Sequence, residues 1–166
     1  TDSDLVVRGS GEALPQVNYT GGFIVRGRGY VYGLQLRSSG NFDTTNNWPI
    51  DIVFEDCEIA PATYSRFCRT AQENIVFINC NYMWRATTSY IYALAGRFTM
   101  IGGTHTNDGA VPNFMIDNSI FGEVHFFGVD LTLFSGKTLI DASGLSNKVT
   151  LTYCKMPASY TLTNTS

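Results

Sequence analysis

Five segments of the sequence repeat one pattern at a nearly constant spacing, and this repeat constrains the fold more than any other feature. They begin at Ile52, Ile75, Phe98, Val124 and Val149, at slightly irregular intervals of roughly 24 residues. Positions one, three, six and eight of each segment are mostly apolar. Alternation of apolar and polar residues indicates a short β-strand, and the change of phase after position four indicates a bend into a second strand. The pattern therefore predicts two short strands that face one common interior.

A second set of segments lies between the first and repeats with nearly the same period. Its centres are Phe67, Ile91, Met115 and Leu139, which follow one another at a constant interval of about 24 residues. Helical solenoids use repeats of about 33 residues or more, and leucine-rich repeats need a leucine and asparagine framework that this chain lacks. Two registers with one period predict an all-β solenoid built of stacked coils.

One segment also matches a known coil pattern. Asn74–Tyr82 reads asparagine, apolar, any residue, apolar, any residue, Asn, Cys, any residue, aromatic. In this pattern the chain resembles the superfamily of right-handed parallel β-helices, which includes pectate lyases, polygalacturonases and many phage tailspikes. The resemblance covers about residues 50–156 and implies an architecture rather than an activity.

The expected architecture is a single-domain right-handed parallel β-helix of about six coils over 1–166, at roughly 24 residues a coil. We expect an irregular start or cap at 1–48, regular coils at 49–156 and a tail or cap at 157–166. The irregular spacing and the absence of hexapeptide repeats favour right-handed coils over left-handed ones.

Stacked coils place equivalent residues above one another at about 4.8 Å, so each inward position becomes a column. One column is expected to contain Phe54, Phe77, Met100, Phe126 and Leu151, and another Cys57, Cys80 and Cys154. The bend corresponds to Asp56, Asn79, Gly102–Gly103, Gly128 and Tyr153. Glycine and asparagine tolerate left-handed backbone geometry, so we expect that geometry at the bend.

Composition and charge argue against several classes of partner. The net charge is −3 and the arginines are scattered, which gives no electrostatic footprint for nucleic acid. No apolar run approaches the roughly 18 to 20 residues of a membrane-spanning helix. The four cysteines form no C-x-x-C pair and no histidine lies at zinc-finger spacing, so we expect buried thiols and no metal site. No P-loop or dinucleotide-binding glycine motif is present, and no cofactor is predicted.

The outward positions of the repeat include an apolar stripe. It consists of Val53, Val76, Ile78, Ile101 and Phe127. Contiguous exposed apolar patches usually mark an interface, and β-helices of virion proteins commonly pack as threefold bundles. We expect the stripe to be the interface of a homo-oligomer, a trimer. The alternative is that a loop such as Gly40–Trp48 covers it.

Should the chain be an enzyme, the best candidates for catalysis are Asp117 and Asp141. They occupy an apolar-Ile-Asp-x-Ser pattern that recurs one coil later. Stacking would place the two carboxylates roughly 5 Å apart, which suits retaining glycoside hydrolysis or cation binding. The alternative, which we prefer, is that each aspartate accepts hydrogen bonds from the nearby serine and backbone in a repeated turn.

Other polar groups carry weaker functional signals. Glu55, Asp56 and Glu58 form an acidic cluster, but the equivalent positions of the next coil are not acidic, so no metal site is predicted there. His105 falls at an inward position and is expected to be a core histidine with its hydrogen bonds satisfied. His125 falls at an outward position, where a general-acid role would need a partner.

These observations favour a non-enzymatic structural or attachment protein. The expected setting is the virion of a bacteriophage or other virus, as a decoration protein, spike or tail-fibre segment that binds capsid or tail proteins or a host surface glycan. A secreted or extracellular location is the alternative. Two other functions stay open: a polysaccharide lyase or hydrolase, and a carbohydrate-binding adhesin that uses exposed aromatic residues, since sugars pack well on aromatic rings.

Overall fold

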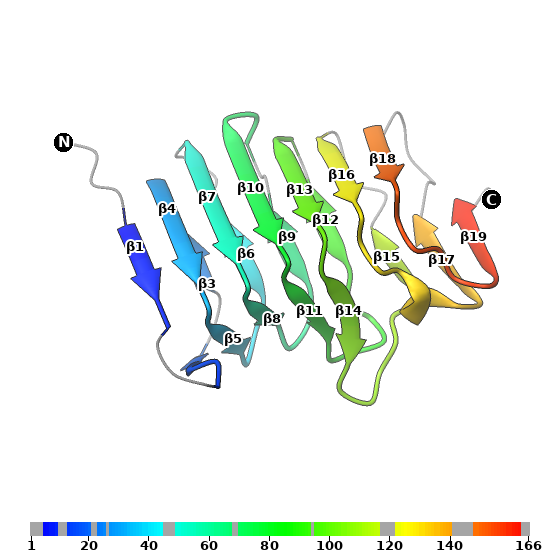
Figure 1. The fold of residues 1–166 in the computed structure, drawn as a ribbon, viewed down its shortest axis with the longest axis horizontal. Coiled ribbons are helices and arrows are strands. Elements are labelled where there is room, and N and C mark those ends of the chain that lie inside the picture. Colours follow the sequence, from blue (N-terminus) through cyan, green and yellow to red (C-terminus); the bar gives the residue numbers. More distant parts are fainter. Residues whose placement is uncertain are drawn as a thin grey trace.

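The chain winds through three parallel β-sheets as a β-solenoid (Figure 1). The computed structural model describes residues 5–9, 13–20, 23–25, 27–44, 49–67, 70–93, 95–116, 122–140 and 148–163. Apart from strands, the described residues form a single short 3₁₀ turn, η1 (Thr132–Phe134). None of the described elements is a helix of the length and apolar character needed to cross a bilayer.

Each sheet is formed by strands from successive circuits of the chain. Sheet A contains β1 (Leu5–Arg8), β4 (Gly27–Tyr32), β7 (Ile50–Glu55), β10 (Glu73–Ile78), β13 (Arg97–Ile101), β16 (Glu123–Phe127) and β18 (Lys148–Thr152). Sheet B contains β2 (Gln16–Tyr19), β5 (Gln35–Ser38), β8 (Glu58–Ala60), β11 (Asn81–Trp84) and β14 (Thr104–Asn107). Sheet C contains β3 (Phe23–Val25), β6 (Phe42–Thr44), β9 (Ser65–Phe67), β12 (Ile91–Ala93), β15 (Phe114–Ile116), β17 (Lys137–Ile140) and β19 (Tyr160–Thr163).

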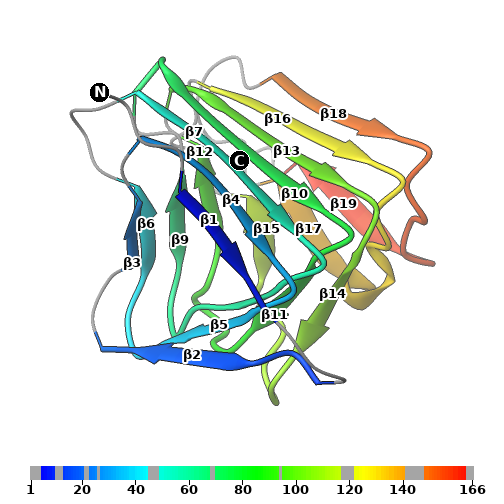
Figure 2. The same cartoon turned by 60° about the vertical axis from the view of Figure 1, so that its left-hand side comes forward.

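The solenoid completes about five turns, close to the six coils expected from the repeat. The last two circuits pass sheet B through isolated bridges at Asp130 and Lys155 instead of strands. In Figure 1 the strands of sheet A descend on the near side, those of sheet C ascend behind them, and the chain advances from left to right. The coils are therefore right-handed, and Figure 2 shows the three sheets enclosing one interior.

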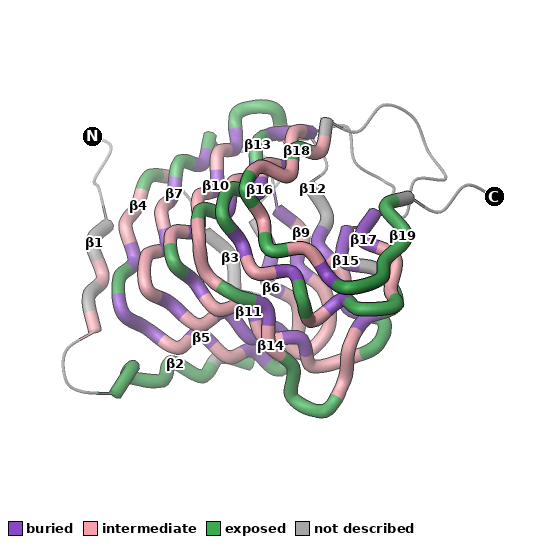
Figure 3. Tube along the Cα trace, turned by 45° about the vertical axis from the view of Figure 1, so that its right-hand side comes forward, coloured by how far each residue is buried: buried purple, intermediate pink, exposed green. Residues whose placement is uncertain are grey.

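The register of sheet A is the one that the sequence repeat predicts. Ile52 pairs with Ile75, Ile75 with Phe98, and the column continues through Val124 and Val149. The column of Phe54, Phe77, Met100, Phe126 and Leu151 forms in the same way. Figure 3 shows the buried residues recurring along each coil. The predicted inward positions are confirmed: Phe54, Phe77, Met100 and Phe126 are buried.

The centres of the second repeat are buried, but the register that their constant interval predicts is wrong in part. Phe67 pairs with Ala93 instead of Ile91, which pairs with Ser65 and Ile116. The cause is the connection Arg85–Tyr90, which is longer than the equivalent Pro61–Tyr64. Because of this longer connection, more residues separate the paired positions Ser65 and Ile91 of sheet C than separate Ile59 and Tyr82 of sheet B. Connections absorb such insertions because they lie outside the ladders.

Phenylalanine rings link sheets A and C across the interior. Between ring centroids, Phe42 lies 5.7 Å from Phe54, and Phe67 lies 5.5 Å from Phe77 and 5.0 Å from Phe98. Most of these pairs meet edge to face, an arrangement that adds about 0.5 to 1.5 kcal/mol a pair beyond the burial of area. These rings are buried, and burial of apolar surface is the main force that stabilises a folded chain.

The bend between sheets A and B adopts left-handed geometry, as predicted. Asp56, Asn79 and Tyr153 have φ of 51°, 50° and 54°, and Gly102 and Gly128 have φ of 63° and 66°. Bend amides donate to the next coil, for example Asn79 N to Ile101 O at 2.8 Å. The ladder of backbone hydrogen bonds therefore continues through the corner.

The cysteine column is buried and forms hydrogen bonds at the same corner. Cys57 and Cys80 are buried and Cys154 is half-buried. Each thiol donates to a carbonyl of the preceding coil, Cys57 to Val31 and Cys80 to Phe54 at 3.3 Å. The hydrogen bond with Cys57, and then burial, raise the pKa of the Cys80 thiol. These features agree with the expected buried thiols, while Cys68 lies outside the described residues.

Strands also occur in the segments expected to be irregular caps. Within 1–48, β1 to β6 pair in parallel with the following coils, for example Val31 with Phe54 and Leu36 with Ile59. Within 157–166, β19 pairs with β17. The sequence pattern weakens there because Gly29 takes an inward position that is Ile52 in the next coil.

The corner geometry predicts different costs for two glycine substitutions. A Cβ at Gly128 would meet nothing within 4 Å, so Gly128→Ala should cost about 1 kcal/mol of unfolding free energy, from left-handed geometry alone. A Cβ at Gly103 would lie 2.1 Å from the Cys80 carbonyl oxygen, so Gly103→Ala should cost roughly 3 kcal/mol or more. Urea unfolding of the two variants measures the difference; equal losses would contradict the close contact between the coils.

Candidate functional site

The outer face of sheet A carries rows of outward side chains, and two of these rows contain the predicted stripe. Reading along the solenoid, the first row is Tyr30, Val53, Val76, Thr99, His125 and Thr150. The second row is Tyr32, Glu55, Ile78, Ile101, Phe127 and Thr152. All five residues of the predicted apolar stripe therefore lie on one face, in adjacent coils.

Within the predicted apolar stripe, exposure increases toward the C-terminal coils. Val53, Val76 and Ile78 are half-buried, whereas Ile101 is 39% and Phe127 48% exposed. Tyr153, at the bend that follows the second row, is 85% exposed, and its ring lies 5.5 Å from that of Phe127. We call Val53, Val76, Ile78, Ile101, Phe127 and Tyr153 the outer patch. The repeat placed Tyr153 at the bend but gave no sign that its ring would join the stripe.

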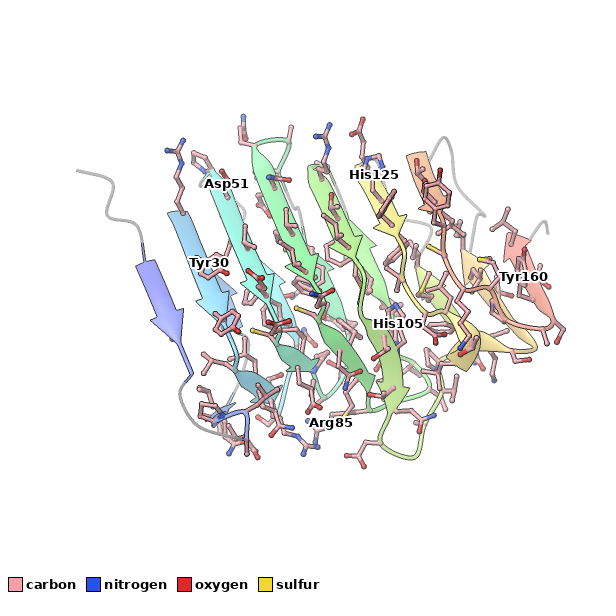
Figure 4. The ribbon with its side chains drawn as sticks, viewed as in Figure 1. Tyr30, Asp51, Arg85, His105, His125 and Tyr160 are labelled. Atoms are coloured by element: carbon pink, nitrogen blue, oxygen red, sulfur yellow. The ribbon has the colours of Figure 1, made fainter. Side chains whose placement is uncertain are left out.

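Charged and polar pairs border the outer patch where the strands of sheet A begin. Asn74 donates to Asp51 at 3.1 Å, and Arg97 forms an ion pair with Glu123 at 2.9 Å. His125 Nε2 lies 3.4 Å from a carboxylate oxygen of Glu123. The sequence had not identified a partner for this histidine. Figure 4 shows Asp51 and His125 at this end of the sheet. A polar border around an apolar centre is the usual composition of a protein interface.

The loop considered as a cover for the stripe has its described part elsewhere. Phe42–Thr44 forms β6 of sheet C, and Phe42 is fully buried in the core. Residues 45–48 lie outside the described part of the chain. The described portion of this loop therefore does not shield Ile101 or Phe127.

The predicted acidic cluster is divided among separate hydrogen bonds. The Glu55 carboxylate accepts from the Tyr30 hydroxyl. Glu58 accepts from Gln35 and, at 3.2 Å, from Asn81. Asp56 occupies the left-handed bend. Among the residues that the structure describes, no three histidine, cysteine, aspartate or glutamate side chains are placed to hold a metal ion together.

The conditional catalytic pair, Asp117 and Asp141, lies outside the described residues. The strands that precede them are described, and in those strands Ile116 pairs with Ile140. The pairing agrees with the repeated pattern from which the two aspartates were selected. Their own geometry and role stay a prediction.

His105 lies in the interior between sheets A and B, within a cluster of aromatic rings (Figure 4). Trp84 Nε1 donates to its Nδ1 at 3.2 Å, and Phe134 of η1 packs against it at 5.3 Å between centroids. Burial lowers the pKa of His105 to about 3, so the ring is neutral at pH 7. Its Nε2 has no hydrogen-bond partner among the described residues. The expectation of a core histidine is therefore correct in position, but only one of its two nitrogens is satisfied.

The outer face of sheet B is polar instead of apolar. One outward row is Gln16, Gln35, Glu58, Asn81, Thr104, Asp130 and Lys155. Neighbours in this row hydrogen-bond, as do Thr104 and Asn81 at 3.3 Å and Lys155 and Asp130 at 3.0 Å. The hydrogen bonds from Thr132, and then Lys155, hold the pKa of Asp130 at about 2. This outward row of sheet B is therefore a polar ladder, unlike the outer patch of sheet A.

A hollow of about 510 Å³ lies beside this ladder at the edge of sheet B. It is lined by Asn18, Thr20, Arg37, Ser38, Ser39 and Arg85. Arg37 and Arg85 are each 28% exposed at the side chain, and Asp108 lies 3.1 Å from Arg37 and 4.0 Å from Arg85. We call this the arginine hollow. The repeat did not indicate it, because Arg85 belongs to the connection Arg85–Tyr90 and not to a strand.

The buried histidine predicts an acid-sensitive stability. The unfolded chain protonates His105 below its ordinary pKa of 6.5, whereas the folded chain binds that proton only near pH 3. Stability is therefore fully present above about pH 6.5 and declines as the pH falls toward 3. At about pH 4.5 the loss should reach roughly 2 to 3 kcal/mol. His105→Gln should remove this part of the decline, measured by urea unfolding between about pH 7 and 4.5; parallel pH profiles would contradict it.

The chain was compared with protein families, curated proteins and solved structures. No family model matches the chain, and no curated protein or solved structure matches it. The fold is thus established by the structure alone, as a right-handed parallel β-solenoid.

Proposed function

We propose that this chain is a non-enzymatic structural or attachment module that assembles as a trimer through the outer patch of sheet A. The observation that carries the proposal is the exposure of Ile101 and Phe127, at 39% and 48%, side by side on adjacent strands of a sheet face. Burying apolar surface is worth about 25 cal/mol per Å², so a continuous row of such side chains favours association.

The arrangement around the patch suits a specific interface. Phe127 and Tyr153 form a T-shaped pair and supply the kind of aromatic anchor that dominates binding energy at interfaces. The Arg97–Glu123 pair and the Asp51–Asn74 contact lie at the border, where they would remain hydrated. An apolar centre with a polar border distinguishes sheet A from sheet B, whose described outer row is polar from Gln16 to Lys155.

Copies of this chain are the partners that fit the patch best. The strands of sheet A repeat at a spacing of about 4.8 Å along the solenoid, so copies around an axis parallel to the solenoid meet with matching spacing. Cyclic symmetry about such an axis gives a closed assembly. In a threefold arrangement each patch lies near the axis and contacts both neighbours.

The proposed setting is the surface of a virion, as a decoration protein, spike or tail-fibre segment. This part rests on the resemblance of the coil pattern at Asn74–Tyr82 to phage tailspikes. Capsid or tail proteins, or a host surface glycan, are the proposed partners; a secreted or extracellular location is the alternative. A lyase or hydrolase function would depend on Asp117 and Asp141, and nothing in the described part of the chain favours it over the structural function.

Substitution of the aromatic anchor tests the interface. Phe127→Ser should weaken the assembly about 30-fold or more, because an interface anchor contributes about 2 kcal/mol or more. Tyr160→Ser is the matched control, since Tyr160 is 43% exposed but lies on β19 of sheet C. Light scattering across a concentration series measures the mass of each variant.

The expected result is that Phe127→Ser dissociates at concentrations at which the unmodified chain and Tyr160→Ser remain trimeric. An unmodified chain that is monomeric at micromolar concentration would contradict the assembly. Dissociation by both substitutions to the same degree would contradict the assignment of the interface to sheet A.

A further inference from the structure

The arginine hollow combines positive charge with hydrogen-bonding groups on an otherwise acidic protein. The whole chain has a net charge of −3, yet the hollow brings together Arg37 and Arg85 against the single carboxylate of Asp108. Because guanidinium groups stay protonated and match carboxylates in geometry, such a site attracts anions that carry a carboxylate. From this arrangement we infer that the hollow binds a carboxylate-bearing sugar unit.

The framework holds both arginines in place. Arg37 lies on β5, where it pairs with Asn18 of β2 and with Ala60 of β8. Arg85 follows β11 and reaches back across the coils: its Nη1 lies 2.8 Å from the Ser38 carbonyl and 3.5 Å from the Ala60 carbonyl. A guanidinium fixed by two carbonyls loses little freedom when a ligand binds, which favours affinity.

The existing ion pair shows what kind of group the arginines accept. Asp108 lies directly after β14, its side chain is 56% exposed, and its Oδ2 is 3.1 Å from Arg37 Nη2. A ligand carboxylate would take the place of this oxygen as partner of Arg37. Asp108 therefore competes with the ligand, and its exposed position allows it to move into solvent when a ligand binds.

The size and the remaining lining select a sugar over a small inorganic anion. Small-molecule sites range from about 300 to 1,000 Å³, and the hollow measures about 510 Å³. Asn18, Thr20 and Ser39 contribute amide and hydroxyl groups to its lining, and these can both donate to and accept from sugar hydroxyls. An acidic sugar uses the arginines for its carboxylate and these groups for its hydroxyls.

Calorimetric titration with 3′-sialyllactose, an acidic sugar, tests the inference, with lactose as the neutral control. The chain should bind sialyllactose and show no heat with lactose. Arg37→Gln should weaken binding at least 10-fold, because a hydrogen-bonded charge partner is lost. Arg66→Gln removes the same charge on sheet C, from a side chain that is 30% exposed and paired with Asp43, and should leave affinity unchanged.

A second substitution predicts a change of opposite sign. Asp108→Asn removes the competing carboxylate and should tighten sialyllactose binding several-fold, an outcome that a destabilised hollow would not give. Equal binding of lactose, an unchanged or weaker affinity in Asp108→Asn, or full displacement of sialyllactose by equimolar sulfate would overturn the inference. The result is independent of the assembly through sheet A, because light scattering reports the oligomer in the same samples.

Discussion

The in-register stacking of inward side chains is the constraint on which the rest of this structure depends. A single coil of about 24 residues cannot bury its own apolar side chains, because they pack against the side chains of the coils on either side. Phe54 is buried because Val31 and Phe77 lie on either side of it in the ladder. The residues of the left-handed bend continue the backbone hydrogen bonds between coils through the corner. The outward surfaces are consequences of the same register.

Because register is shared by all coils, each outward position also becomes a row, and the three sheets can present different chemistry. Sheet A offers the outer patch and sheet B a polar ladder with the arginine hollow at its edge. On sheet C, Arg66 pairs with Asp43 and lies over the Tyr64 ring, which stacks on Tyr90 at 5.4 Å. A scaffold of this kind allows the proposed assembly and the proposed ligand binding to occupy separate faces.

Sequence reasoning succeeded where identical positions recur and failed where the coil length changes. The columns through Phe54 and Cys57, and the bend at Asn79, follow from spacing alone, because strand periodicity fixes which side chains point inward. The predicted pairing of Phe67 with Ile91 was wrong, because the longer connection Arg85–Tyr90 shifts the register of sheet C. The spacing of the apolar residues in the sequence does not show this shift. The same connection produces the arginine hollow, so a site formed by an insertion lies outside what a repeat can predict. The orphaned Nε2 of His105 likewise depends on packing by Trp84 and Phe134.

The proposed assembly is tested most directly by the solution mass of the unmodified chain, because trimer formation would bury the outer patch. The chain has a mass of 18.3 kDa. Light scattering should give three times that mass at micromolar concentration, with no change on dilution through that range. A single-chain mass at every concentration would contradict the proposed trimer, since Ile101, Phe127 and Tyr153 would then remain in contact with water.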